Sequence, residues 1–307
     1  MGAGRIQIRE GEREIMRNWA SVSNVRVVRN TSSWIKRFAL MAICAGALIN
    51  QVRAADPVIY SSVYNGPGGA ATFYSVNPNT GAATAIGAIG FNQVGAISFD
   101  TSGILYGVGN RISDGAQVLL KINPATGAGT QVGATTQSAS FQDIAFRNSD
   151  GALYGYSGGD IYTFNITTGA ATLLGNAGDG FPSGNGLAFS PFDTLYKADN
   201  NNLSTIDQST GAATVVEPLN YPTFGDRVNA MKFDNSTGVL WASVKDGGTT
   251  NYLATVDLVN GNVTEIGMTQ TGTDGLVVAL ALIPEPGTLT LVGMSLAGLL
   301  TLRRRKK

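Results

Sequence analysis

The chain has 307 residues, with 21 basic and 21 acidic side chains, one cysteine and no histidine. Without histidine there is no Ser-His-Asp or Cys-His catalysis, and the commonest zinc ligand is missing. The charges are unevenly spread, because residues 55–302 hold seven basic and eighteen acidic side chains. An acidic body does not neutralise phosphates, so we expect no nucleic-acid partner.

Residues 1–54 predict a signal peptide with an extended n-region. Two basic residues precede an apolar stretch over 38–49, and small residues follow up to Ala54. This order is typical of secretory signal peptides, and we expect cleavage after Ala54, with Ala55 as the alternative. A membrane anchor that is never cut is the alternative. The only cysteine, Cys44, lies in the apolar stretch, so the mature body would have neither a thiol nucleophile nor a disulfide.

A hairpin pattern recurs five times in residues 55–283. Each copy has an apolar residue, an Asn or Asp, three loop residues and a Gly. The Asn or Asp and the Gly are Asn77 and Gly81, Asn123 and Gly127, Asn165 and Gly169, Asp207 and Gly211, and Asp257 and Gly261. Asn or Asp favours the start of a turn, and Gly accepts the positive φ that closes it. The copies begin 42 to 50 residues apart, which fits one four-stranded propeller blade per copy.

A second pattern lies between the hairpins. Apolar–aromatic pairs occur at Ile59-Tyr60, Leu105-Tyr106, Leu153-Tyr154, Leu195-Tyr196 and Leu240-Trp241. In four repeats an alternating strand that ends near a phenylalanine comes just before the pair. Each repeat therefore predicts an inner strand, an aromatic strand, a hairpin strand and an outer strand.

The ends of the body predict how the ring closes. The first repeat lacks an inner strand, and a lone apolar strand, 276–282, follows the last hairpin. We expect this strand to complete the first blade, so that the all-β fold is a five-bladed β-propeller closed by its N- and C-terminal strands. A β-sandwich or an open β-solenoid is the alternative.

The loops from each outer strand to the next inner strand would share one face, opposite to the end of strand 276–282. Their aromatic side chains form the candidate binding face: Phe91, Phe141, Phe181, Tyr221 and Phe224. Two interpretations are open for these residues. They could stack on the sugar rings of a ligand, or they could pack between blades and close the mouth of the channel.

We predict no catalytic, cofactor or metal site. Calcium could bind near the acidic residues Asp143, Asp160, Asp179, Asp199 and Asp226, but these lack the alternating spacing of a calcium loop. We expect them to form turns instead. A carboxylate pair for glycoside cleavage stays open as an alternative, with Asp226 and Arg227 in the loop 218–228 as its candidate cluster.

The last 24 residues have three parts. Pro284, Glu285 and Pro286 come first, an apolar run over 289–302 follows, and Arg303, Arg304, Arg305 and two lysines end the chain. The prolines favour extended backbone, as in a protease substrate. The apolar run predicts a short transmembrane helix, with the cations on the cytoplasmic side. A core helix or strand is the alternative, but five cations make a poor end for a buried element.

This order of parts resembles the PEP-CTERM sorting tail of Gram-negative bacteria. The resemblance implies recognition and cutting by exosortase, a membrane protease, so that the membrane holds the chain through residues 284–307 before processing. It also implies a cell-surface or extracellular protein that accompanies exopolysaccharide and biofilm. We therefore expect a non-catalytic binding or structural component, with exopolysaccharide as a possible partner. The alternative is a secreted propeller enzyme, a hydrolase or lyase of polysaccharide.

Overall fold

The described part of the chain consists of strands. The computed structural model describes residues 56–66, 68–137, 140–180, 184–221, 226–248, 250–270 and 276–283. Within these ranges there are twenty strands and no helix, and so no helix suited to crossing a bilayer. The signal segment with Ala54, the tail from Pro284 onward, Phe181 and Phe224 lie outside the described residues.

The strands fall into four classes by their place in a blade. The inner strands are β4 (Asn92–Phe99), β8 (Asp143–Phe146), β12 (Gly186–Phe189), β16 (Arg227–Phe233) and β20 (Leu276–Leu282). The second strands are β1 (Ile59–Tyr64), β5 (Leu105–Asn110), β9 (Leu153–Ser157), β13 (Leu195–Ala198) and β17 (Leu240–Lys245). The third strands are β2 (Thr72–Val76), β6 (Gln117–Ile122), β10 (Asp160–Phe164), β14 (Asn202–Ile206) and β18 (Asn251–Val256). The outer strands are β3 (Ala83–Ala88), β7 (Gly129–Ala134), β11 (Ala171–Asn176), β15 (Ala213–Pro218) and β19 (Val263–Gln270).

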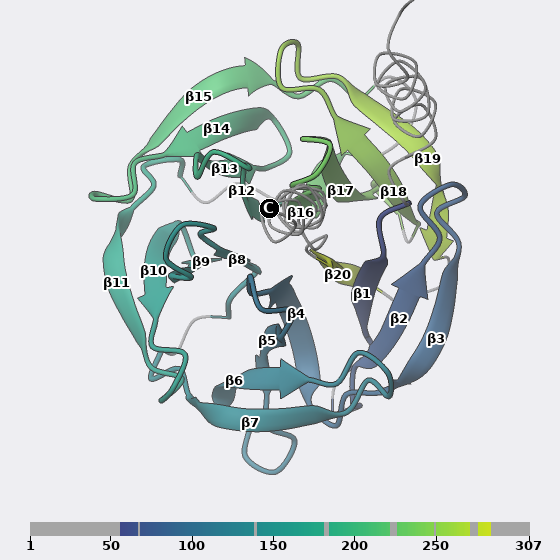
Figure 1. Ribbon diagram of the computed structural model, residues 1–307, viewed down its shortest axis with the longest axis vertical. Helices are drawn as coiled ribbons and strands as arrows, with labels where there is room; N and C mark the ends of the chain where they lie inside the picture. Colours follow the sequence, from purple (N-terminus) through teal and green to yellow (C-terminus); the bar gives the residue numbers. More distant parts are fainter. Residues whose placement is uncertain are drawn as a thin grey trace, which may run out of the picture. The chain divides into compact units, whose positions relative to one another are not determined.

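These strands form five antiparallel sheets of four strands each, arranged as blades around a central axis (Figure 1). Blade one is β20-β1-β2-β3, and blades two to five follow in chain order from β4. The prediction of a five-bladed β-propeller is confirmed.

The closing strand lies where the sequence places it. β20 pairs with β1, from Ile59 opposite Leu282 to Tyr64 opposite Leu276. The backbone N–H of Ile283 donates to the carbonyl of Val58 at 3.1 Å. Figure 1 shows β20, in yellow, next to β1, in purple. The two ends of the body therefore complete one sheet.

The repeated hairpin has the expected geometry. In the first copy the Asn77 side-chain oxygen accepts the N–H of Asn79, and the Asn77 carbonyl accepts the N–H of Gly81, both at 2.8 Å. Gly81 has a φ of 74°, which favours glycine.

Each hairpin turn also contacts the outer strand of the preceding blade. At four of the five boundaries that strand presents a glycine at the contact: Gly87, Gly133, Gly175 and Gly267.

A hydrophobic core fills each of the five boundaries between blades. At four of them, the aromatic residue of a second strand packs against the phenylalanine that ends the next blade's inner strand. The ring centroids are 5.2–5.9 Å apart: Tyr60–Phe99 at 5.9 Å, Tyr106–Phe146 at 5.2 Å, Tyr154–Phe189 at 5.2 Å and Tyr196–Phe233 at 5.6 Å. At the fifth boundary Trp241 and Leu282 share one core. This packing explains the aromatic pattern, because both partners recur once per blade.

Candidate functional site

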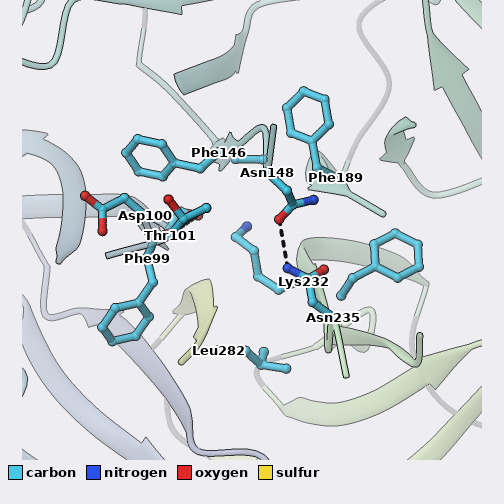
Figure 2. Close-up of a pocket in the computed structure, with 12 residues that line it drawn as sticks. Phe99, Asp100, Thr101, Phe146, Asn148, Phe189, Lys232, Asn235 and Leu282 are labelled. Atoms are coloured by element: carbon cyan, nitrogen blue, oxygen red, sulfur yellow. Dashed lines mark hydrogen bonds between the residues drawn. The ribbon is translucent and has the colours of Figure 1, made fainter. Parts of the chain in front are cut away.

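The central channel has two mouths. We call the face where the inner strands end, at Leu282 in β20, the tail face, and the opposite face the loop face. At the tail face a small cavity of about 60 Å³ lies among the ends of the inner strands. Figure 2 shows Lys232 between Phe99, Phe146 and Phe189, with Asn235 donating a hydrogen bond of 2.8 Å to Asn148. A cavity of this size holds waters rather than a sugar ring.

A buried ion pair lies beside this cavity, and its lysine forms part of the cavity wall. The Lys232 Nζ donates to Asp143 Oδ1 at 2.7 Å, and to the carbonyls of Leu187 and Met231 at 3.1 and 2.8 Å. The other Asp143 oxygen accepts the N–H groups of Leu187 and Met231 at 2.8 and 3.2 Å. The pair therefore joins the inner strands of blades three, four and five. Burial raises the pKa of Asp143 to about 6 and lowers the pKa of Lys232. Asp143 is thus a residue of this inner network, and the expectation that it forms a turn is wrong.

The loop-face mouth holds a larger pocket of about 300 Å³, at the lower end of the range for small-molecule sites. Uncharged side chains and one backbone segment line it: Tyr64, Gln93, Gly95, Ser140, Phe141, Gln142, Asn185 and Asn229.

The fold brings three of the amides to one level of the pocket. Gln142, Asn185 and Asn229 each lie four residues before the phenylalanine that ends their inner strand. Because the inner strands run side by side around the axis, this shared position places all three at the loop-face mouth. Gly95 holds the same position in blade two, so a backbone without a side chain widens that side of the pocket.

Much of the hydrogen-bonding capacity of this pocket is unused within the described chain. The Asn185 Oδ1 is buried and accepts no hydrogen bond there. The side chains of Asn229 and Tyr64 make no hydrogen bond to the described residues. The Gln142 Oε1 accepts the N–H of Gly158 at 3.3 Å, which leaves the amide NH₂ as a donor. A buried acceptor without a partner is costly, and a ligand or water would satisfy it.

The predicted aromatic residues that the structure describes lie between blades. Phe141 is 3% exposed, and its ring centroid lies 5.1 Å from Tyr162 and 4.7 Å from Phe164. Half-buried Phe91 packs against the core between blades one and two, and half-buried Tyr221 donates its hydroxyl to the Asp199 carbonyl at 3.0 Å. Phe141 also forms part of the pocket wall. A binding role for this set stays a prediction.

A second charged cluster lies in blades three and four. The Lys197 Nζ is 2.6 Å from Asp179 Oδ2 and 3.2 Å from Asp199 Oδ2, and it lies 4.8 Å from the centroid of Tyr156. Lys197 is 1% exposed, and burial raises the pKa of the Tyr156 hydroxyl. Both carboxylates also line a cavity of about 170 Å³. The lysine occupies the position between the carboxylates that a metal ion would need.

Two further acidic residues of the predicted set contact neighbouring side chains. Asp160 accepts a hydrogen bond of 2.7 Å from Asn176 across neighbouring strands. Asp226 lies 3.6 Å from Arg227, and both side chains are partly exposed. The described residues contain no group of three or more metal-binding side chains.

Three solved structures are similar to this chain at low identity. TolB from Acinetobacter baumannii is 12% identical with a TM-score of 0.47, and the match covers 80% of this chain and 61% of that one. A putative 6-phosphogluconolactonase from Bacteroides uniformis is 15% identical with a TM-score of 0.41, over 71% of this chain and 84% of that one. The PQQ-bound aldose sugar dehydrogenase from Streptomyces coelicolor is 14% identical with a TM-score of 0.41, over 75% and 85%. The chain thus spans less than two thirds of the TolB structure, and a search of curated proteins finds no significant match.

The described body is therefore a five-bladed β-propeller with an uncharged axial pocket. Residues 282–306 match the PEP-CTERM protein-sorting motif. The chain is an exported protein that exosortase sorts, and it passes through a membrane-anchored intermediate.

Proposed function

We propose that this exported protein is a non-catalytic binding protein of the cell surface or extracellular matrix, and that it binds a neutral carbohydrate, such as a segment of exopolysaccharide. The observation that carries this proposal is the loop-face pocket, in which amides at the inner strands of three blades meet and none of the described lining side chains is charged. The pocket lies on the face opposite to the end of β20, after which the sorting tail begins in the sequence, so we expect a chain anchored by that tail to present the pocket away from the membrane.

The chemistry of the lining fits a sugar. A sugar hydroxyl both donates and accepts hydrogen bonds, and an amide side chain offers a carbonyl acceptor and an NH₂ donor a short distance apart. Asn185 contributes a buried acceptor, and Asn229 and Tyr64 contribute groups that make no hydrogen bond to the described chain. Phe141 supplies an apolar wall against which the C–H face of a sugar ring can pack. Without a lining cation, an acidic sugar gains no ion pair there.

The test is a binding and turnover screen with neutral and uronate-containing oligosaccharides. We expect binding of neutral sugars without cleavage, and Asn229→Ala should weaken that binding by about three- to tenfold, the effect of one lost hydrogen bond. Asn235→Ala is the matched control, because this amide lies at the tail-face mouth. Equal losses in the two variants, or a preference for uronates, would contradict the proposal.

Cleavage of the bound sugar would instead favour the alternative of a secreted hydrolase or lyase. Asp179 and Asp199 are a pair of carboxylates that line one cavity, so Asp199→Asn would then abolish turnover. For a binding protein, the same variant should leave affinity for neutral sugars unchanged, since neither carboxylate lines the loop-face pocket.

A further inference from the structure

Every blade exposes at least one large apolar side chain on the tail face. We propose that this face lies on the zwitterionic headgroup layer of the membrane while the tail still anchors the chain. The exposed residues are Val58, Ile104, Ile166, Phe192, Val239 and Val259. Phe192 is 90% exposed and Val259 is 81% exposed, so both present nearly all of their apolar surface to the surroundings.

Strand pairing places these residues on one face. The turns that follow the inner strands and the hairpin turns that follow the third strands both lie at the end of the blades where β20 finishes. Turns of the first kind carry Ile104, Phe192 and Val239. Hairpin turns carry Ile166 and Val259. The set therefore forms a ring of apolar contacts around the tail-face mouth rather than one continuous patch.

The turn that carries Phe192 is held in place by hydrogen bonds. The Ser190 hydroxyl accepts the N–H groups of Phe192 and Thr194 at 3.3 and 3.1 Å. The Asp193 carboxylate accepts the N–H groups of Asn148 and Ser149, from blade three, at 2.7 and 3.0 Å. Asp193 itself has a φ of 60°, an uncommon conformation that these bonds support. The aromatic ring is thus presented outward by an ordered turn, which reduces the entropy lost on docking.

The length of the connection sets how close this face must be to the bilayer. Ile283 is the last described residue and bonds to Val58 of the propeller, and the apolar run of the tail begins at Leu289. The five residues between them span at most about 18 Å. The headgroup region on each side of a bilayer is roughly 5–8 Å thick. An anchored chain therefore keeps the tail face beside the headgroups, where a high effective concentration makes weak apolar contacts sufficient.

The negative charge of the tail face favours zwitterionic over anionic lipid. Seven aspartates lie in or beside the same set of turns: Asp56, Asp100, Asp150, Asp193, Asp207, Asp234 and Asp257. By the same criterion the described chain has two exposed or partly exposed cations here, Arg147 in a turn and Lys121 just before one, so the aspartates outnumber them. Anionic lipids would repel such a face, whereas zwitterionic headgroups would not.

The experiment uses the full chain with Cys44→Ser, anchored by its tail in phosphatidylcholine vesicles that contain a nitroxide-labelled headgroup. A fluorophore at Ile104→Cys reports on the tail face, and the same fluorophore at Ile112→Cys, in a loop-face turn, is the matched control. We expect strong quenching of the first label and little quenching of the second. Equal quenching of both labels would overturn the proposal.

Two further arms test the contacts themselves. Phe192→Ser combined with Val259→Ser should reduce the equilibrium constant for docking, reported at position 104, by at least about tenfold, because burial of even one large apolar side chain is worth that much. Replacing half of the lipid with phosphatidylglycerol should also weaken docking, and added salt should restore it. No effect of the double substitution, or tighter docking on anionic lipid, would refute the proposal. Sugar binding by the loop-face pocket is unaffected by either result.

Discussion

At the level of single residues, the buried Asp143–Lys232 pair links the inner strands of three blades. Replacing Lys232 with Met would leave a buried carboxylate without its cation, although its backbone hydrogen bonds would remain. We expect Lys232→Met to lower the free energy of unfolding by about 3–5 kcal/mol at pH 7. Urea denaturation followed by fluorescence measures this loss.

The matched control for this prediction is an exposed ion pair. Arg111 and Asp114 form a pair in a surface turn, where water screens the charges. Arg111→Ala should therefore change stability by little more than the error of the measurement. If Lys232→Met were as mild as Arg111→Ala, the buried pair would not hold the inner strands together.

The glycines of the outer strands give a second prediction. A Cβ atom at Gly175 would overlap the carbonyl oxygen of Thr210 in the next blade's hairpin turn. The added Cβ is fixed to the backbone and the carbonyl belongs to it, so neither can rotate away and the blades would have to move apart. Gly175→Ala should therefore lower the free energy of unfolding by about 1–3 kcal/mol. Gly247→Ala is the control, since its nearest neighbour, the Asp226 carboxylate, lies 3.5 Å away in ordinary contact. Thermal melting of both variants distinguishes the two sites, and equal melting temperatures would argue against the contact.

The pocket residues were harder to predict than the turns. A hairpin turn is formed by neighbouring residues, so the spacing of Asn77 and Gly81 is enough to predict it. Gln142, Asn185 and Asn229 are brought together by the ring, and their signal is a shared distance from the phenylalanine that ends each inner strand. The search for aromatic residues found Phe141 in the pocket wall but missed these amides, because amides are common in any polar loop.

At the level of strands, β20 decides whether the propeller is complete. Its residues Ala279, Leu280 and Ala281 are buried in the cores on both sides of blade one. A chain that stops after Gly275 would expose the edge of β1 and open both cores. We expect that truncation to lose cooperative unfolding, whereas a chain that stops after Ile283 should keep it. Calorimetry on the two truncations tests this, and similar transitions would show that ring closure is dispensable.

The strands themselves were largely predictable. The closing strand has the bounds that the sequence indicates, 276–282, and the hairpins fall at all five expected positions. Alternation and turn residues are short-range signals, which is why they were sufficient. Contacts between blades were not predictable in the same way. The outer-strand glycines, such as Gly175, meet a turn from another repeat, and no spacing within one repeat reveals that contact.

For the propeller as a unit, stability should depend on pH. The pKa of Asp143 is about 6 in the folded chain, above its ordinary value near 4, because the carboxyl is buried. Between these values the folded state binds more protons than the unfolded state, so stability falls as pH rises from 4 to 6, by about 3 kcal/mol at most. Asp150 and Asp207 have the opposite effect on stability, because hydrogen bonds to their charged forms hold their pKa values at about 2. The stability that these two carboxylates add is lost as the pH falls from 4 towards 2. We expect the highest melting temperature near pH 4.

Two substitutions separate these contributions. Asp143→Asn removes the titrating group and should flatten the melting temperature between pH 4 and 6. Asp207→Asn should leave that region unchanged and reduce only the loss at lower pH. A melting temperature that rises from pH 4 to 6 in the unaltered chain would contradict the assignment to Asp143.

The pairing of β20 with β1 also orders the events of export. A chain that emerges N-terminus first delivers β1, β2 and β3 at the start, yet their sheet lacks its axial strand until residues 276–282 have crossed. The sorting motif begins at residue 282, at the end of that same strand. A chain exported in this direction therefore cannot close its ring before the whole body and the start of its sorting motif have crossed the membrane.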